Sequence, residues 1–103
     1  MIRIEYQVDK NRAIALDTDK EDKRVGKIKY VEQEGNWVVN STFVRPDYTG
    51  QGIAGLLLEE IVKQAREKGV KIVPECSYVE HAFEKKEEYA DVWANKYLKG
   101  KIL

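Results

Sequence analysis

The sequence contains very few of the residues from which disulfide and metal sites are built: its 103 residues include one cysteine, one histidine and two prolines. A single cysteine cannot form an internal disulfide bond, which is typical of proteins in a reducing compartment. One histidine and one cysteine cannot assemble a His/Cys zinc site, and the scattered carboxylates lack the spacing of metal ligands. We therefore expect neither a disulfide nor a metal ion.

Long hydrophobic runs and an excess of either charge are also absent. No segment approaches the ~18 consecutive apolar residues of a membrane helix. Residues 1–10 alternate apolar and polar side chains, unlike a signal peptide. The 18 basic residues balance the 18 acidic ones, so the chain has no electrostatic reason to bind nucleic acid. These observations predict a cytoplasmic protein without nucleic-acid or membrane partners, and we take a monomer as the default.

The sequence does contain the alternation of apolar and polar side chains that is typical of β-strands. The chain is long enough for one domain, so we expect a single domain over residues 1–103. The charged run at 17–24 is expected to be a solvated loop. Turn-forming residues separate the apolar segments, which favours an antiparallel meander. The predicted strands span residues 2–8, 13–16, 25–31 and 37–44.

The apolar period changes to that of a helix after Gly52. One apolar stripe at helical spacing consists of Ile53, Ala54, Leu57, Leu58, Ile61, Val62 and Ala65. Gly69 follows as a helix-terminating residue. Residues 70–74 predict a short strand of the central sheet, and residues 77–80 have the form of a capping box with Ser77 as N-cap. Residues 82–97 predict a helix, broken near the Lys-Lys-Glu-Glu cluster. We therefore expect an α+β fold, a mixed sheet with helices packed on it, or a mixed three-layer domain.

The loop before the first predicted helix contains two glycines, Gly50 and Gly52, one residue apart. One interpretation is structural: the glycines permit the turn after Pro46 and the packing of the helix on the sheet. The other is functional, because a helix N-terminus presents unpaired N–H groups and about half a positive charge. Glycines there let a phosphate approach without a Cβ in the way. The glycines alone do not decide between the two.

The wider segment 43–79, FVRPDYTGQGIAGLLLEEIVKQAREKGVKIVPECSYV, resembles the central motif of the GNAT superfamily of acyl-CoA-dependent N-acetyltransferases. That motif consists of a strand, a turn containing Q/R-x-x-G-x-G/A, an amphipathic helix and a further strand. The small size and the sequence IVPECSYV are similar to the minimal, single-domain YjdJ-type branch. The resemblance extends from Val38 to the end of the chain and implies a small GNAT-like fold.

The resemblance also implies that the chain binds acetyl-coenzyme A (acetyl-CoA). Backbone groups of Phe43 and Val44 would pair with the pantetheine arm and face the acetyl carbonyl. Two positions depart from the family pattern: Asp47 replaces the usual Gln or Arg, and Thr49 replaces a frequent Arg. An Asp near a pyrophosphate would reduce affinity. The backbone N–H groups that would hold the pyrophosphate of coenzyme A (CoA) belong to Thr49, Gly50, Gln51, Gly52, Ile53, Ala54 and Gly55.

Cys76 is the candidate catalytic residue. It precedes the expected helix N-terminus at Ser77, a position that favours a thiolate. The resemblance would place it beside the thioester end of the cofactor. The alternative is a small packed side chain, which lone cysteines of reducing compartments usually are. Both interpretations stay open.

Together these features predict an N-acetyltransferase that transfers the acetyl group of acetyl-CoA to an amine, with backbone donors polarising the thioester carbonyl. The acceptor amine cannot be identified from the sequence. Because no residue is an evident general base, an acyl-CoA-binding or regulatory module with little turnover is one alternative. Acyl transfer through Cys76 is another.

Overall fold

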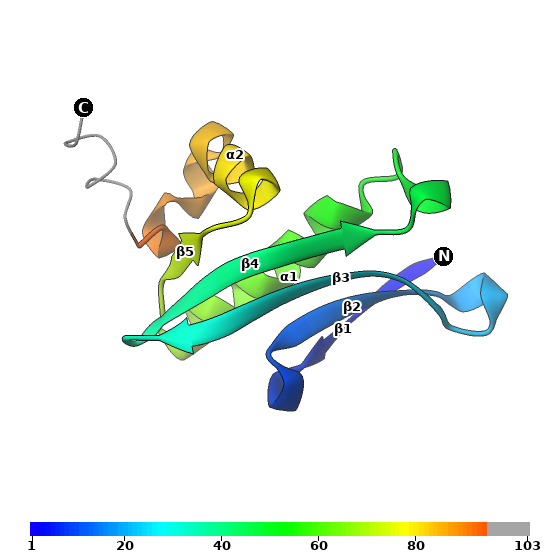
Figure 1. Cartoon of the computed structure of the whole chain (residues 1–103), viewed down its shortest axis with the longest axis horizontal. Coiled ribbons are helices and arrows are strands. Elements are labelled where there is room, and N and C mark those ends of the chain that lie inside the picture. The colour runs from blue at the N-terminus through cyan, green and yellow to red at the C-terminus, as the bar shows by residue number, and fades with distance from the viewer. Residues whose placement is uncertain (95–103) are drawn as a thin grey trace.

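The computed structural model describes residues 1–94 and arranges them as a five-stranded sheet with α-helices packed on it (Figure 1). The strands are β1 (Ile2–Gln7), β2 (Arg12–Asp17), β3 (Lys23–Gln33), β4 (Asn36–Val44) and β5 (Ile72–Pro74). The helices are α1 (Ile53–Lys68) and α2 (Ser77–Lys85). Short 3₁₀ helices span Val8–Lys10, Thr18–Lys20, Pro46–Tyr48 and Glu87–Val92.

The sheet has the strand order β1-β2-β3-β4-β5, and its first four strands form the expected antiparallel meander. The connections match the turn chemistry: Asn11 and Gly35 adopt positive φ at the β1–β2 and β3–β4 turns. β5 runs parallel to β4 and forms the edge of the sheet. The α+β class and the mixed sheet are confirmed.

The charged run at 17–24 is not a solvated loop throughout, as the sequence suggested. Asp17 is the last residue of β2 and is buried, while Lys23 already begins β3. Only residues 18–22 connect the two strands. The prediction was wrong at Asp17 because its hydrogen-bond partner is Tyr48, which is 31 residues away along the chain.

The strands β4 and β5 diverge shortly after they meet. Their pairing covers only Trp37–Val39 opposite Ile72–Pro74. Asn40 has no partner in β3, because the register shifts between Lys29 and Tyr30, and such a bulge bends the strand that carries it. Within residues 1–94, no strand pairs with the outer edge of β4 from residue 40 to residue 44. β4 therefore presents a stretch of unpaired edge backbone towards α2.

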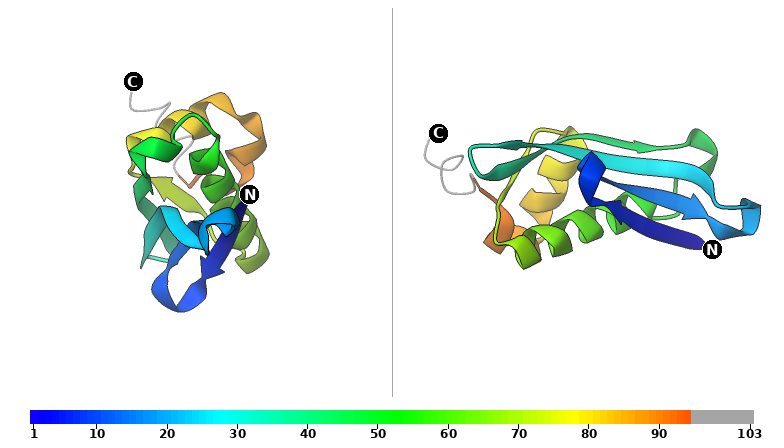
Figure 2. Two further views of the ribbon diagram at one scale, coloured as in Figure 1. Left: turned by 90° about the vertical axis from the view of Figure 1, so that its right-hand side faces the viewer. Right: turned by 90° about the horizontal axis from the view of Figure 1, so that it is seen from below.

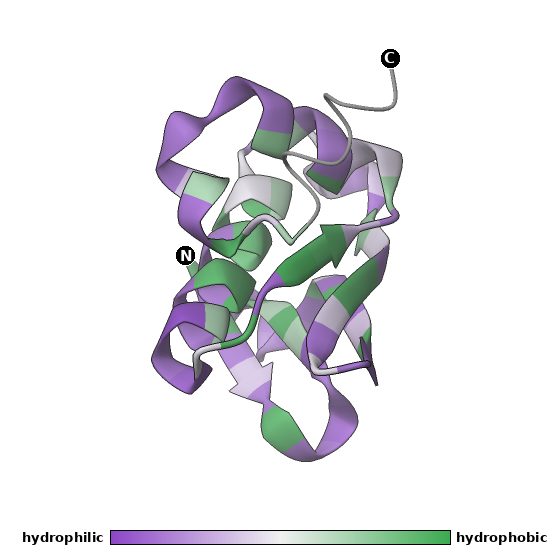
Figure 3. Ribbon diagram, turned by 90° about the vertical axis from the view of Figure 1, so that its left-hand side faces the viewer, coloured by the Kyte–Doolittle hydropathy of each residue, from purple (hydrophilic) through white to green (hydrophobic). Residues whose placement is uncertain are grey.

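Both helices lie on the same face of the sheet, so the described part has two layers rather than three (Figure 2). The ribbon of β5 is coloured mainly as hydrophobic, and hydrophilic residues dominate the outer sides of the helices (Figure 3). Strands β2 to β5 and both helices contribute buried residues to a single core cluster, and partly buried residues of β1 pack against it. All members of the predicted α1 stripe are buried except Ala54, which is partly exposed. Gly69 ends α1 with a φ of 70°, as expected.

The second helix begins one residue earlier than the capping box predicts. Cys76 is the N-cap of α2, Ser77 is already helical, and no side-chain hydrogen bond caps the helix. The break near the Lys-Lys-Glu-Glu cluster is confirmed, because α2 ends at Lys85 and a 3₁₀ helix follows. Residues 95–103, which include the end of the predicted 82–97 helix, lie outside the described residues.

Candidate functional site

The glycine loop connects the unpaired end of β4 to the N-terminus of α1. Gly50 and Gly52 have φ values of 85° and 78°, in the left-handed region that favours glycine. Gly52 is also the N-cap of α1. A Cβ added at either position would meet no atom within 4 Å. The turn itself therefore requires these glycines, and their surroundings are open.

The backbone N–H groups of this loop have no internal partners. The first helical hydrogen bond of α1 runs from Leu56 N to Gly52 O over 3.2 Å. Within residues 1–94, none of the N–H groups of residues 50–55 donates a hydrogen bond. They lie at the positive end of a helix dipole. The loop thus combines unpaired donors with a favourable field, which is the combination that binds phosphate and other anions.

A cavity of about 270 Å³ opens on this loop. Tyr78 of α2 closes one side of it, and its hydroxyl oxygen lies 3.7 Å from the position of a Cβ on Gly55. A larger depression of about 430 Å³ lies between α1, β1 and the 3₁₀ helix Glu87–Val92, and more than half of its lining residues are charged. The smaller cavity is lined by Val44, Tyr48, Thr49, Gly50, Gly52, Ile53, Ala54, Gly55 and Tyr78.

Most of the predicted cofactor-binding residues meet at this cavity. Gln51 is exposed and does not line it, and Phe43 is 50% exposed. Phe43 lines a separate small groove together with Arg24, Lys27 and other residues of the β3–β4 end. Asp47 does not line the cavity either, and its carboxylate lies 3.4 Å from Arg45 Nε. The carboxylate that departs from the family pattern is therefore engaged by a neighbouring cation.

Cys76 lies beside the unpaired edge of β4. Its backbone N–H donates to Val39 O, and its thiol donates to Thr42 Oγ1 over 3.6 Å. Burial alone would raise the pKa of this thiol. However, the Thr42 hydroxyl and the backbone N–H groups of Val79 and Tyr78 favour the thiolate, and the net pKa is lowered. The side chain is partly buried and does not line the cavity. The side chain also packs against the hydrophobic core, so the structure shows features of both interpretations, a lowered thiol pKa and a packed side chain.

Two tyrosines at the cavity have raised pKa values. Tyr78 is 40% exposed, and partial burial raises the pKa of its hydroxyl, followed by the charge of Cys76. Tyr48 owes its raised pKa first to a hydrogen bond with Asp17. Both hydroxyls hold their protons at neutral pH. Tyr89, by contrast, is buried in the core and does not line this cavity.

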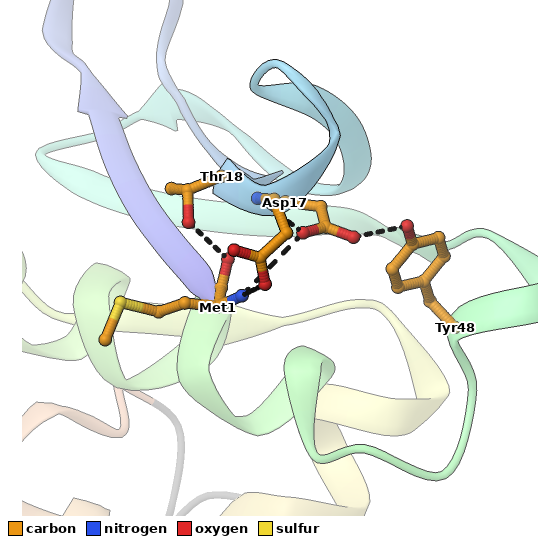
Figure 4. Close-up of polar contacts among 5 residues, drawn as sticks. Met1, Asp17, Thr18 and Tyr48 are labelled. Carbon is orange, nitrogen blue, oxygen red and sulfur yellow. Dashed lines mark hydrogen bonds and ion pairs between the residues drawn. The ribbon is translucent and has the colours of Figure 1, made fainter.

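The contact between Asp17 and Tyr48 could not be found from the sequence (Figure 4). Tyr48 Oη donates to Asp17 Oδ2 over 2.5 Å, and Asp19 N donates to Asp17 Oδ1 over 3.0 Å. The pKa of Asp17 is lowered, chiefly by the Tyr48 hydroxyl. The only signal in the sequence was an Asp at the end of an apolar strand, and it did not indicate a partner in a distant loop.

A sequence model of the GCN5-related N-acetyltransferases (GNAT) matches residues 12–92. The chain belongs to this family. A GCN5-like protein from Staphylococcus aureus, solved by NMR, is 28% identical, with 88% of this chain and 86% of that one covered at a TM-score of 0.69. A GCN5-related N-acetyltransferase from Sphaerobacter thermophilus is 29% identical. That alignment covers 63% of this chain and 21% of the other protein, with a TM-score of 0.59. No curated protein matches the chain.

Two further observations concern what the described part of this GNAT chain does not contain. Across residues 1–94, no group of three or more His, Cys, Asp or Glu side chains could hold a metal ion. Neither helix in that range is long and apolar enough to cross a membrane. The site therefore has to be understood from its backbone donors, its tyrosines and its thiol.

Proposed function

We propose that the chain is an acetyl-CoA-dependent N-acetyltransferase that acts on an amine not yet identified. We further propose that residues 1–103 form a single domain of the minimal YjdJ-type branch, monomeric and cytoplasmic. Membership of the GNAT family supports the reaction class. The observation that carries the proposal is the cavity at the N-terminus of α1, which is lined by Gly50, Gly52, Ile53, Ala54 and Gly55, whose N–H groups donate no hydrogen bond within residues 1–94.

The residues present fit coenzyme A at two places. Residues 50–55 provide backbone donors for the pyrophosphate, whereas the N–H of Thr49 already donates to Pro46 O over 3.4 Å. Among residues 1–94, no atom lies within 4 Å of a Cβ added at Gly50 or Gly52. The outer edge of β4, with which no strand of residues 1–94 pairs from residue 40 to residue 44, provides main-chain groups for the amides of a pantetheine arm beside Phe43 and Val44, as an added strand would use them. Acetyl-CoA supplies an acetyl group activated as a thioester.

The chain itself contributes orientation and polar groups rather than an evident base. Backbone N–H groups at the end of β4 can polarise a carbonyl without any side chain, because they are fixed by the sheet. Tyr78 Oη holds a proton at the side of the cavity. Among residues 1–94, no carboxylate or imidazole lines the cavity, so in this proposal the amine arrives deprotonated or loses its proton to solvent.

A second candidate function rests on Cys76. The lowered pKa of this thiol, and its position at the N-cap of α2 beside Thr42 of β4, support a role in which it attacks a thioester held at Phe43 and Val44. The thiolate would form a new thioester as the bond from the acetyl carbon to the CoA sulfur breaks, and the CoA thiolate would leave. The amine would then take the acetyl group from Cys76.

A titration and a turnover assay test these proposals. Isothermal titration calorimetry with CoA measures binding, and release of free thiol from acetyl-CoA across a panel of protein, peptide and small-molecule amines measures transfer. We expect binding and amine-dependent release. Binding without release from any amine would instead favour the acyl-CoA-binding module, and absence of binding would refute the cofactor assignment.

Intact-mass measurement after incubation with acetyl-CoA separates direct transfer from transfer through Cys76. An acetyl adduct that disappears in Cys76→Ala, together with loss of turnover, would support the covalent route. Full activity of Cys76→Ala on a confirmed amine would leave direct attack by the amine as the mechanism, with Cys76 as a packing residue.

A further inference from the structure

Asp17 is the only charged side chain that is buried among residues 1–94, with 8% of its surface exposed. A buried carboxylate needs hydrogen-bond donors to offset the loss of water. Asp17 accepts from Tyr48 Oη at 2.5 Å and from Asp19 N at 3.0 Å. The Met1 amino group lies 3.8 Å from Oδ1. The strongest of these contacts therefore leads to the glycine loop, not to the strand that carries Asp17.

Tyr48 links that carboxylate to the cavity. It is the last residue of the 3₁₀ helix Pro46–Tyr48, and it lines the cavity beside Thr49 and Gly50. Its hydroxyl is fixed by Asp17, and the Lys23 ammonium lies 5.8 Å from the centre of its ring. Because the ring and the hydroxyl of Tyr48 are both held, the backbone of Tyr48 is fixed directly before residues 49–55.

Few other contacts hold the loop in place. Arg45 N donates to Val25 O at the end of β4, and Thr49 closes the 3₁₀ turn by donating from Oγ1 to Pro46 O. Beyond Thr49, the N–H groups of residues 50–55 have no partner within the described part of the chain, which leaves them available to a ligand. Within residues 1–94, the bond between Tyr48 and Asp17 is thus the one side-chain hydrogen bond that joins this loop to a distant strand.

We propose that Asp17 is a positioning residue, which acts through Tyr48 to hold residues 49–55 in the conformation that binds the pyrophosphate of coenzyme A. This inference rests on the proposed function. Without the hydrogen bond, the loop would spend only part of its time in that conformation, and the apparent dissociation constant rises in inverse proportion to the competent fraction. A competent fraction of about one tenth would weaken binding about tenfold.

Tyr48→Phe removes only the hydroxyl and is the decisive variant. We expect its dissociation constant for CoA to rise about tenfold in calorimetry, while urea unfolding still shows a folded protein whose midpoint is lowered by the loss of this donor to Asp17. Asp17→Ala should weaken binding similarly, and the double variant should be no worse than either single one, because both remove the same contact. Asp17→Asn keeps an acceptor for the hydroxyl and should bind more tightly than Asp17→Ala.

The matched control is Tyr6→Phe. It also removes a tyrosine hydroxyl from a partly buried hydrogen bond, the 2.7 Å contact between Tyr6 and Tyr30, which lies away from the cavity. If the loss of any tyrosine hydroxyl weakened CoA binding, Tyr6→Phe would bind CoA more weakly too. If Tyr48→Phe acts by releasing the loop, Tyr6→Phe leaves the affinity for CoA unchanged. We expect Tyr6→Phe to bind CoA as the unaltered protein does.

A second readout separates positioning from stability. In steady-state turnover, Tyr48→Phe should raise KM for acetyl-CoA while leaving KM for S-acetylpantetheine, which lacks the pyrophosphate, unchanged. If Tyr48→Phe bound CoA as tightly as the unaltered protein, this inference would be wrong, whereas the proposed function would stand. An equal loss in Tyr6→Phe would do the same. If the unaltered protein failed to bind CoA, the proposed function itself would fall, and this inference with it.

Discussion

Replacing Gly52 with valine separates the two roles of the glycine loop, turn formation and ligand binding. Gly52 has a φ of 78°, and nothing lies within 4 Å of an added Cβ. Gly35, in the β3–β4 turn, has a φ of 80° and equally open surroundings, but does not line the cavity. Gly35→Val is therefore a control with the same backbone change at a remote site.

The expected cost to stability is similar for both variants. A non-glycine residue forced into the left-handed region costs about 1–3 kcal/mol. Small domains have a free energy of unfolding of about 5–15 kcal/mol, so both variants should remain folded at 25 °C. Their urea midpoints should fall by comparable amounts.

The expected cost to binding differs. Valine at position 52 relaxes by moving the loop away from its left-handed conformation, which turns the N–H groups of residues 50–55 away from the cavity. Hydrogen bonds to a charged group contribute about 1.5–3 kcal/mol each. If Gly52→Val loses about 1.5–3 kcal/mol of the free energy of CoA binding in total, its dissociation constant for CoA rises about 10- to 150-fold. Gly35→Val should leave the dissociation constant unchanged.

Calorimetric titration with CoA at 25 °C, alongside urea unfolding of the same samples, measures both quantities. The reasoning would be refuted by a Gly52→Val protein that is folded and binds CoA as tightly as the unaltered chain. An equal loss of affinity in Gly35→Val would also refute it, because the effect would then follow from backbone strain and not from the cavity.

Three further outcomes are expected. Alkylation of Cys76 by iodoacetamide should reach half its maximal rate at a lower pH in the folded protein than in urea, because the folded site lowers the thiol pKa. Thr42→Val should move this half-maximal pH upward. The same half-maximal pH in the folded protein, the unfolded protein and the variant would contradict this. Leu57→Ala, at a side chain with no exposed surface, should lower the free energy of unfolding by about 2–5 kcal/mol, and a loss below about 1 kcal/mol would show that the core collapses around the site. The chain should not bind duplex DNA or RNA in a gel-shift assay, and salt-sensitive submicromolar binding would prove the charge argument wrong.

Local patterns predicted most of the fold. Alternation located the four strands of the meander, and the apolar stripe located α1 together with its end at Gly69. These features depend on neighbours in the sequence, so they can be read from it. The cap of α2 was misplaced by one residue, because Ser77 and Cys76 are both compatible with a helix start and the pairing with Val39 O decides between them.

Long-range contacts limited the prediction of the site. The motif predicted which loop residues bind the cofactor, and most of these residues line one cavity. Tyr78 enters that cavity from α2, and Asp17 reaches Tyr48 from the far end of β2. Neither contact leaves a local pattern, because it depends on how the strands and helices pack.

The bulge at Asn40 also has a consequence for self-association. A strand edge with unpaired N–H and C=O groups is a template on which another extended chain can add. From residue 40 to residue 44, β4 offers such an edge within the described part of the chain. A strand from a second copy and the arm of a bound cofactor would use the same groups, so each would exclude the other. Protein prepared without CoA should therefore show more concentration-dependent association in sedimentation velocity than protein saturated with it.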